Sequence, residues 1–283
     1  MERATKKAIR RFGIAGAVLL LGLILVPLLT IFYLGCGVID VMRNKRRDAM
    51  VFRKYFMGNG ITTWLLSPLN LLVDLFCYRN KGVYKLDDLP PEWREEVNSV
   101  LDIFRNQKDA IVAEIDETFE DGRRGMYVYE WYGKRKEHAV EGLKRDYKYV
   151  KTIAVSVFSG KESTSFHYGP LRMTLRVLFN LTPVDTDKVY IQCGWEKHFW
   201  RDDPLYIFDD TLIHRSVNDY DARRFVVFMD IVRPTAYPEL LSKLIAGVSV
   251  LVERANAMFY KNWKMLRPGA KSAEPPTPHS EAA

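Results

Sequence analysis

The sequence predicts a mainly β protein: a double-stranded β-helix, or jelly roll, with flanking helices and an N-terminal membrane segment. Three observations predict it. Between residues 147 and 235, short stretches of alternating apolar and polar residues follow one another with no helical spacing between them. Helical spacing of apolar residues appears before and after this region. An uncharged run from Phe12 to Ile39 lies near the N-terminus and is long enough to span a bilayer.

Composition sets the class of protein. The 283 residues are 48% hydrophobic, which is enough for a folded core of one domain with attachments. The net charge is +7, but residues 1–54 alone carry a balance of +8, so the rest of the chain is nearly neutral. Because this basic excess flanks an apolar segment, it indicates attraction to anionic lipid headgroups and no nucleic acid partner. Three scattered cysteines form no metal or disulfide spacing, which favours a reduced, cytoplasm-facing domain.

The N-terminal part is predicted to attach the protein to a membrane. A basic N-terminus (1–11) precedes the segment 12–39, which is predicted to be a transmembrane helix or a helical hairpin bent at Pro27. The basic juxtamembrane region 40–60 follows, and cations on both flanks favour either a hairpin or a second crossing. A second apolar segment, 61–78, contains Asp74, so it is interpreted either as interfacial or re-entrant, or as a buried element of the domain.

The remaining elements follow in order. Residues 84–145 form a helical lead-in, broken by Gly122-Arg123-Arg124-Gly125 and ending in a basic, aromatic stretch that either meets lipid phosphates or forms a loop or edge strand. The jelly-roll core is expected over 146–235. A helix over 237–267 has a wide apolar stripe and is predicted either to lie on the membrane surface or to pack against the β domain. The Pro-rich tail 268–283 is predicted to be disordered. Strands are expected at Thr152–Phe158, Met173–Leu181, Val189–Gly194, Leu205–Phe208 and Phe225–Val232.

Two histidines in the β region stand out as candidate metal ligands. His167 is followed nine residues later by Arg176, and His214 is followed ten residues later by Arg224. A jelly roll commonly holds Fe(II) with two histidines and a carboxylate that stands two residues after the first histidine. Gly169 occupies that position here, so the ordinary triad lacks its carboxylate. The adjacent Asp209 and Asp210 are interpreted as turn residues of the loop that precedes His214.

The segment 156–234 resembles the aspartyl/asparaginyl β-hydroxylase family of 2-oxoglutarate oxygenases, which has a two-histidine iron site without a carboxylate ligand. The residues that carry the resemblance are Ser156, His167-Tyr168-Gly169-Pro170, Arg176, Ile207-Phe208-Asp209-Asp210 leading to His214, Arg224 and Asp230-Ile231-Val232-Arg233-Pro234. One departure is Leu178, where family members often have a histidine, and it makes that wall of the expected site more apolar.

The resemblance implies a division of roles. His167 and His214 would bind Fe(II), and Arg224 with the Ser156 hydroxyl would bind the distal carboxylate of 2-oxoglutarate. A guanidinium suits this role because it can donate two parallel hydrogen bonds to one carboxylate. Arg176 would face the same cavity and engage a cosubstrate or substrate carboxylate. The implied reaction uses O₂ to convert 2-oxoglutarate to succinate and CO₂ while it hydroxylates an unactivated C–H bond.

The expected substrate is an acyl chain of a bacterial lipid. The core follows closely on the basic, apolar N-terminal region, and no spacer or repeat domain separates the two. The plan is similar to that of lipid A acyl-chain 2-hydroxylases, with the core facing the cytoplasm at the bacterial inner membrane. Three alternatives remain open: an ornithine-lipid hydroxylase, a hydroxylase of peptidyl aspartate or asparagine or of a free amino acid, and an iron-free jelly roll that acts as a membrane scaffold or lipid-binding module.

Overall fold

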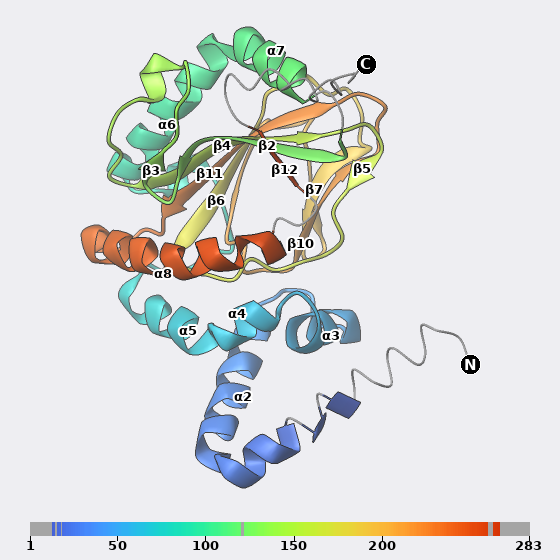
Figure 1. Cartoon of the computed structure of the whole chain (residues 1–283), viewed down its shortest axis with the longest axis vertical. Helices are drawn as coiled ribbons and strands as arrows, with labels where there is room; N and C mark the ends of the chain where they lie inside the picture. The colour runs from blue at the N-terminus through green and yellow to red at the C-terminus, as the bar shows by residue number, and fades with distance from the viewer. Residues whose placement is uncertain (1–12, 15, 18, 120–121, 260–262, 267–283) are drawn as a thin grey trace, which may run out of the picture.

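The computed structural model describes residues 13–266 except 15, 18, 120–121 and 260–262. Two β-sheets form the body of the molecule, and helices lie outside them (Figure 1). The chain begins with four helices: α2 (Pro27–Val41), α3 (Ala49–Met57), α4 (Ile61–Leu65) and α5 (Ser67–Phe76). The short strand β1 (Val83–Tyr84) and a 3₁₀ turn (Leu86–Asp88) lead to α6 (Pro91–Asn106) and α7 (Lys108–Thr118).

The larger sheet has eight strands. Its order is β1, β9 (Leu205–Phe208), β6 (Thr174–Asn180), β11 (Arg224–Val232), β4 (Val150–Phe158), β2 (Arg124–Trp131) and β12 (Lys264–Leu266), and β3 (Lys134–Arg135) pairs with the end of β2. Neighbours are antiparallel except β12, which runs parallel to β2. A second 3₁₀ turn (Glu141–Leu143) joins β3 to β4. Apart from β2 and β3, strands that are neighbours in this sheet are not consecutive in the sequence, as in a jelly roll.

The smaller sheet faces the larger one. Its order is β5 (Glu162–Ser163), β10 (His214–Asn218), β7 (Val189–Cys193) and β8 (Glu196–Phe199). A cluster of buried apolar residues fills the space between the two sheets, and it includes Met126, Leu178, Ile191, Phe208 and Phe228. The mainly β jelly roll predicted from the alternating pattern is present.

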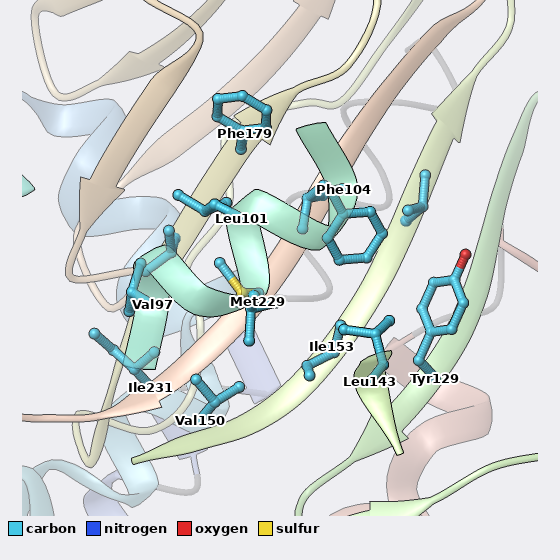
Figure 2. Packing of buried hydrophobic residues seen from close by; sticks show 14 of the residues in the cluster. Val97, Leu101, Phe104, Tyr129, Leu143, Val150, Ile153, Phe179, Met229 and Ile231 are labelled. Carbon is cyan, nitrogen blue, oxygen red and sulfur yellow. The ribbon is translucent and has the colours of Figure 1, made fainter. Parts of the chain in front are cut away.

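Helices cover the other face of the larger sheet. Val97, Leu101 and Phe104 of α6 pack over Ile153 of β4 and Met229 of β11 (Figure 2). The apolar residues of α6 recur every three to four positions, which places them on one side of the helix. This cluster supports the back of the sheet whose front carries the candidate site.

The helical lead-in predicted for 84–145 ends earlier than expected. After α7 ends at Thr118, the basic, aromatic stretch forms β2, which pairs with β4 on one side and β12 on the other. It is therefore a paired strand of the main sheet, and the interpretation of this stretch as a loop is wrong. Its side chains alternate between the two faces of the sheet, as in a strand. Tyr127 and Tyr129 pack under α6 and α7, while Met126 and Val128 face the other sheet.

The predicted transmembrane helix is also revised. No helix within the described residues is both long and apolar enough to cross a membrane. α2 begins at Pro27, and Val26 before it has a non-helical backbone. Proline lacks the N–H of a helix interior and is well placed at a helix start, so it interrupts the apolar run. The N-terminus 1–11 and the tail 268–283 lie outside the described residues.

The two remaining predicted helical segments pack against the core. In the segment 61–78, Thr63, Asn70 and Val73 are buried while Leu72 and Leu75 are exposed. α8 (Pro238–Phe259) buries Leu241 and Ile245 against β11 and α5, and it exposes Leu240 and Leu244. Each helix therefore has one face on the protein and one apolar face toward solvent.

Candidate active site

The two candidate metal ligands lie side by side at one end of the smaller sheet. His214 is the first residue of β10, and His167 forms an isolated β-bridge with it through two backbone hydrogen bonds of 2.9 and 3.0 Å. Their ring centroids are 4.2 Å apart. The fold thus brings together two histidines that lie 47 positions apart in the sequence.

A backbone carbonyl oxygen contacts each histidine ring at Nδ1. The Nδ1 atom of His167 lies 2.8 Å from the carbonyl oxygen of Ser165, and Nδ1 of His214 lies 2.8 Å from that of Leu212. A carbonyl oxygen only accepts, so each Nδ1 carries the proton and each Nε2 keeps a free electron pair. Such a carbonyl partner is typical of metal-binding histidines.

Burial keeps both rings neutral. It lowers the pKa of His167 to about 4. It also lowers the pKa of His214 well below the usual value, and the neighbouring His167 adds to this effect. Neutral imidazoles are the ligand form, so the pair fits a divalent metal such as Fe(II) at neutral pH. Within the described residues, no group of three or more His, Cys, Asp or Glu side chains is arranged to hold a metal.

Arg224 and Ser156 lie on the inner face of the larger sheet. In the register of β11 and β4, Arg224 pairs with Phe158 and Val226 pairs with Ser156, so the two residues are diagonal neighbours on one face. Ser156 donates to the carbonyl oxygen of Val226 at 3.2 Å. Arg224 reaches across to the smaller sheet, where it donates to Ser216 Oγ at 2.6 Å and to the Val217 carbonyl at 3.3 Å.

The charge of Arg224 has no counterion in the part of the chain that the structure describes. Its side chain is buried, its Nε has no hydrogen-bond partner there, and its guanidinium lies 4.6 Å from the ring centroid of Phe158. Burial alone lowers the pKa of this arginine. A buried guanidinium without a carboxylate is costly unless a ligand supplies an anion.

Arg176 lies between two carboxylates of the protein. Its guanidinium lies 3.0 Å from Asp210 and 3.0 Å from Asp230, and it lies 4.0 Å from the ring centroid of Phe228. Burial raises the pKa of both carboxyl groups, that of Asp210 to about 7, while Arg176 opposes this rise. Arg176 does lie on the face of the larger sheet that is turned toward the smaller sheet, but two protein carboxylates already pair with it. Its predicted contact with a cosubstrate or substrate carboxylate stays a prediction.

Gly169 makes room for one of these carboxylates. A Cβ atom at position 169 would overlap the Asp210 carboxylate, so the space that a side chain would take here belongs to Asp210. The Gly169 N–H also donates to the Asp210 carbonyl at 2.7 Å. Asp209 has the predicted turn role, because it accepts from the Thr211 N–H at 2.9 Å and from its hydroxyl at 2.6 Å.

Residues outside the predicted site hold the two histidine loops in place. The Oδ1 of Asn44 accepts from the N–H of Ile213 at 2.8 Å, and Thr63 donates to the Gly169 carbonyl at 2.9 Å. Asn70 accepts from the N–H of Arg172 at 2.9 Å and donates to the Pro170 carbonyl at 3.2 Å. The N-terminal helices therefore contact the loops next to both histidines, which sequence reasoning missed.

A buried cluster of six charges lies behind these loops. Arg172 is 1% exposed and forms ion pairs with Asp40 of α2, with Asp209 at 3.2 Å and with Asp74 of α5 at 3.3 Å. Asp74 also pairs with Arg43 and Arg233. One signal could have revealed the cluster: Asp40 and Asp74 each stand in an apolar helical run, where a carboxylate requires a buried cation.

Comparisons with known proteins agree with the resemblance. The family model described as aspartyl/asparaginyl beta-hydroxylase matches residues 94–234. A curated relative, an ornithine lipid ester-linked acyl 2-hydroxylase of Rhizobium tropici, is 32% identical over 88 residues, which is 31% of this chain and 31% of that protein. The match therefore spans about a third of the length of that relative.

Solved structures have lower sequence identity to this chain. A non-heme α-ketoglutarate-dependent carbocyclase from nogalamycin biosynthesis is 15% identical, with a TM-score of 0.30 over 57% of this chain and 93% of that one. A cupin domain of Bordetella pertussis tohama I is 15% identical, with a TM-score of 0.25 over 39% of this chain and 97% of that one. TM-scores of 0.30 and 0.25 carry no argument about this chain, so the fold assignment rests on its own strand order.

Proposed function

Residues 94–234 place this chain in the aspartyl/asparaginyl β-hydroxylase family, and on that premise we propose that it is an Fe(II)- and 2-oxoglutarate-dependent hydroxylase of a lipid acyl chain. The observation that carries the proposal is the pairing of two neutral histidines with a buried arginine that lacks a counterion in the described residues. One site thus offers two metal ligands and an anion-binding group.

The spacing of these groups fits 2-oxoglutarate. Ser216, which accepts from Arg224, stands two residues after His214 on β10. Alternate residues of a strand face the same side and lie roughly 7 Å apart, so the guanidinium is about one strand repeat from the histidine pair. A five-carbon diacid can span that gap with one carboxylate near the metal and the other on Arg224 and Ser156.

The protein's own residues then have distinct tasks. His167 and His214 hold Fe(II) through Nε2, and Arg224 orients 2-oxoglutarate by its distal carboxylate. Phe208 and Leu178 belong to the buried apolar cluster between the sheets, and the Phe208 ring centroid is 5.0 Å from that of His214. This apolar surface would exclude water from the site. When bound, Fe(II) with 2-oxoglutarate supplies the activation of O₂ for hydroxylation of a C–H bond.

The proposed substrate is the 2-position of an acyl chain in a bacterial membrane lipid. The name of the curated relative supports 2-hydroxylation of an ester-linked acyl chain of ornithine lipid. The N-terminal plan of the chain supports a secondary acyl chain of lipid A. The shared chemistry is 2-hydroxylation of an acyl chain, and the proposed location is the inner membrane with the core facing the cytoplasm, where Fe(II) and 2-oxoglutarate are available.

The test is a turnover assay of the full chain in detergent with Fe(II), labelled 2-oxoglutarate, and either lipid A or ornithine lipid. We expect succinate formation coupled to a gain of one oxygen atom in the acyl chain of one of the two lipids, detected by mass spectrometry. His214→Ala should abolish both products. His198→Gln is the matched control, because His198 on β8 donates from Nε2 to the Asp203 carbonyl at 2.9 Å and lies outside the pair. Normal hydroxylation by His214→Ala would refute the site.

A further inference from the structure

The first half of α2 exposes a broad apolar face and projects from the body of the protein (Figure 1). Leu28, Leu29, Ile31 and Phe32 are 84%, 54%, 58% and 54% exposed. At about 100° per residue, these four positions cover roughly 160° of the helix circumference. An exposed apolar face of this width indicates contact with another apolar phase.

The chain bends sharply where α2 begins. A Cβ atom at Gly22 would lie 2.8 Å from Thr30 Oγ1, although residues eight apart in a straight helix lie roughly 12 Å apart along the axis. Val26, between them, has φ −141° and ψ 61°, outside the helical region. In Figure 1 the helical residues before Pro27 run at a steep angle to α2, and the bend is the point farthest from the sheets. The apolar segment therefore forms a hairpin with Val26 and Pro27 at its tip.

The two ends of the hairpin differ in character from its tip. The C-terminal end of α2 is fixed to the body, because Asp40 is buried and pairs with Arg172. Exposed cations follow at Arg47 and Arg53, and the sequence before Phe12 is rich in lysine and arginine. Basic residues at both ends and none at the tip match a bilayer surface with anionic headgroups over an apolar interior.

We propose that this hairpin inserts its tip into one leaflet of an anionic bilayer without crossing it. The 15 residues of α2 extend roughly 22 Å at ~1.5 Å per residue, less than the ~30 Å hydrocarbon core. Because both arms leave on the same side, both basic flanks stay with the anionic headgroups. The inference is independent of the proposed catalytic function, since its readouts are membrane binding and topology.

The first experiment measures binding of the full chain to vesicles of phosphatidylcholine with phosphatidylglycerol. We expect Leu28→Ser combined with Phe32→Ser to reduce co-sedimentation at least tenfold. Trp195→Ser is the matched control, because Trp195 is 59% exposed in the turn between β7 and β8, and it should bind as the parent does. Unchanged binding of the double variant would overturn the proposal. The proposal would also be overturned if the parent formed a dimer, bound no vesicles, and became monomeric in the double variant.

The second experiment distinguishes a hairpin from a crossing. Ala4→Cys and Arg47→Cys are treated with a membrane-impermeant maleimide in intact spheroplasts and after permeabilisation, with the parent chain as the background. We expect both positions to be labelled under the same condition. Labelling of one position from outside and of the other only after permeabilisation would show that the segment crosses the bilayer and would overturn the proposal.

Discussion

At the scale of single residues, Arg224 links folding to cosubstrate binding. It is buried, its Nε lacks a partner, and within the described chain it has no carboxylate to balance its charge. The energetic cost of this arrangement is recovered only when an anion binds. Ser216 and the Val217 carbonyl hold the guanidinium in position but supply no negative charge.

Arg224→Lys should therefore impair use of 2-oxoglutarate and leave metal binding unchanged. Lysine keeps the charge but cannot donate two parallel hydrogen bonds, a loss of roughly 1.5–3 kcal/mol, or about 10- to 100-fold in KM for 2-oxoglutarate. Steady-state kinetics gives KM, and titration with Co(II) as a spectroscopic probe gives metal affinity. Equal losses of both would contradict the assignment. Arg224→Met should lose 2-oxoglutarate binding while it unfolds at no lower urea concentration than the parent.

Glu130 provides a pH prediction. Burial raises its pKa to about 7, although Lys151 and Arg135 oppose this. A carboxyl group with a raised pKa in the folded state binds more protons there than in the unfolded state, so stability falls as pH rises from about 4.5 to about 7. We expect Glu130→Gln to raise Tm relative to the parent at about pH 8 and to change it little at about pH 5. An equal shift at both pH values would contradict this origin of the effect.

At the scale of elements, the six-charge cluster joins α2 and α5 to the jelly roll. Arg43, Arg172 and Arg233 face Asp40, Asp74 and Asp209, so the cluster is neutral as a whole. Arg172 keeps the pKa of Asp209 below its usual value even though burial acts in the opposite direction. The cluster lies directly behind the turn that carries Asp210 and precedes His214.

Removing one carboxylate from this cluster should destabilise the protein strongly. Asp40→Ala removes one of the three carboxylates that pair with the buried Arg172, so its positive charge is no longer fully balanced. Breaking a buried ion pair in this way typically lowers the free energy of unfolding by about 3–5 kcal/mol. We expect a lower urea midpoint by circular dichroism, whereas Asp146→Ala, at an exposed aspartate, should leave the midpoint within error. A small effect of Asp40→Ala would show that solvent reaches the cluster.

Asn44 positions the candidate metal ligand His214 through the residue that precedes it. Its side chain accepts from the Ile213 N–H, one residue before His214, and donates to the Val41 carbonyl at 3.0 Å. Asn44→Ala leaves that buried N–H without its acceptor, which costs about 1–3 kcal/mol, so we expect Co(II) affinity to fall by roughly tenfold. Asn106→Ala, at the exposed end of α6, is the matched control. Unchanged metal affinity with reduced stability alone would make Asn44 a merely structural residue.

Local patterns predicted the elements better than the contacts between them. Alternation located β4, β6, β7, β9 and β11 within a few residues, because each buries one or both faces in a jelly roll. For β2 it left a loop or an edge strand open, because its cations and tyrosines resemble a surface segment; the structure shows a strand paired on both sides and covered by α6. The histidine pair followed from spacing and resemblance. Asn44, Asn70 and Arg172, in contrast, act through contacts between residues 100 or more positions apart, which local periodicity cannot predict.

At the scale of the whole molecule, the exposed apolar surface is concentrated on one side. α5 and α8 are neighbours, because Val73 of α5 packs with Leu241 and Ile245 of α8 (Figure 1). Their outward positions are apolar as well: Leu72, Leu75 and Phe76 on α5, and Leu240 and Leu244 on α8. α5 also holds the loop after His167 through Asn70, so this face and the candidate site share one support.

This α5–α8 face should present a bilayer substrate to the site. Leu75→Ser combined with Leu240→Ser removes two apolar contacts with the bilayer. Full burial of a leucine side chain is worth roughly 1.5–3 kcal/mol, and partial burial at an interface contributes less. We expect KM for acyl lipid in vesicles to rise about tenfold while kcat stays constant. Turnover of the same lipid dispersed in detergent should match the parent, because no bilayer then has to be approached. Tyr220→Ser, an exposed aromatic in the turn between β10 and β11, should leave both rates unchanged. If the double variant lost activity equally in detergent, the two leucines would be acting through the fold of the site and the face would have no role in reaching the membrane.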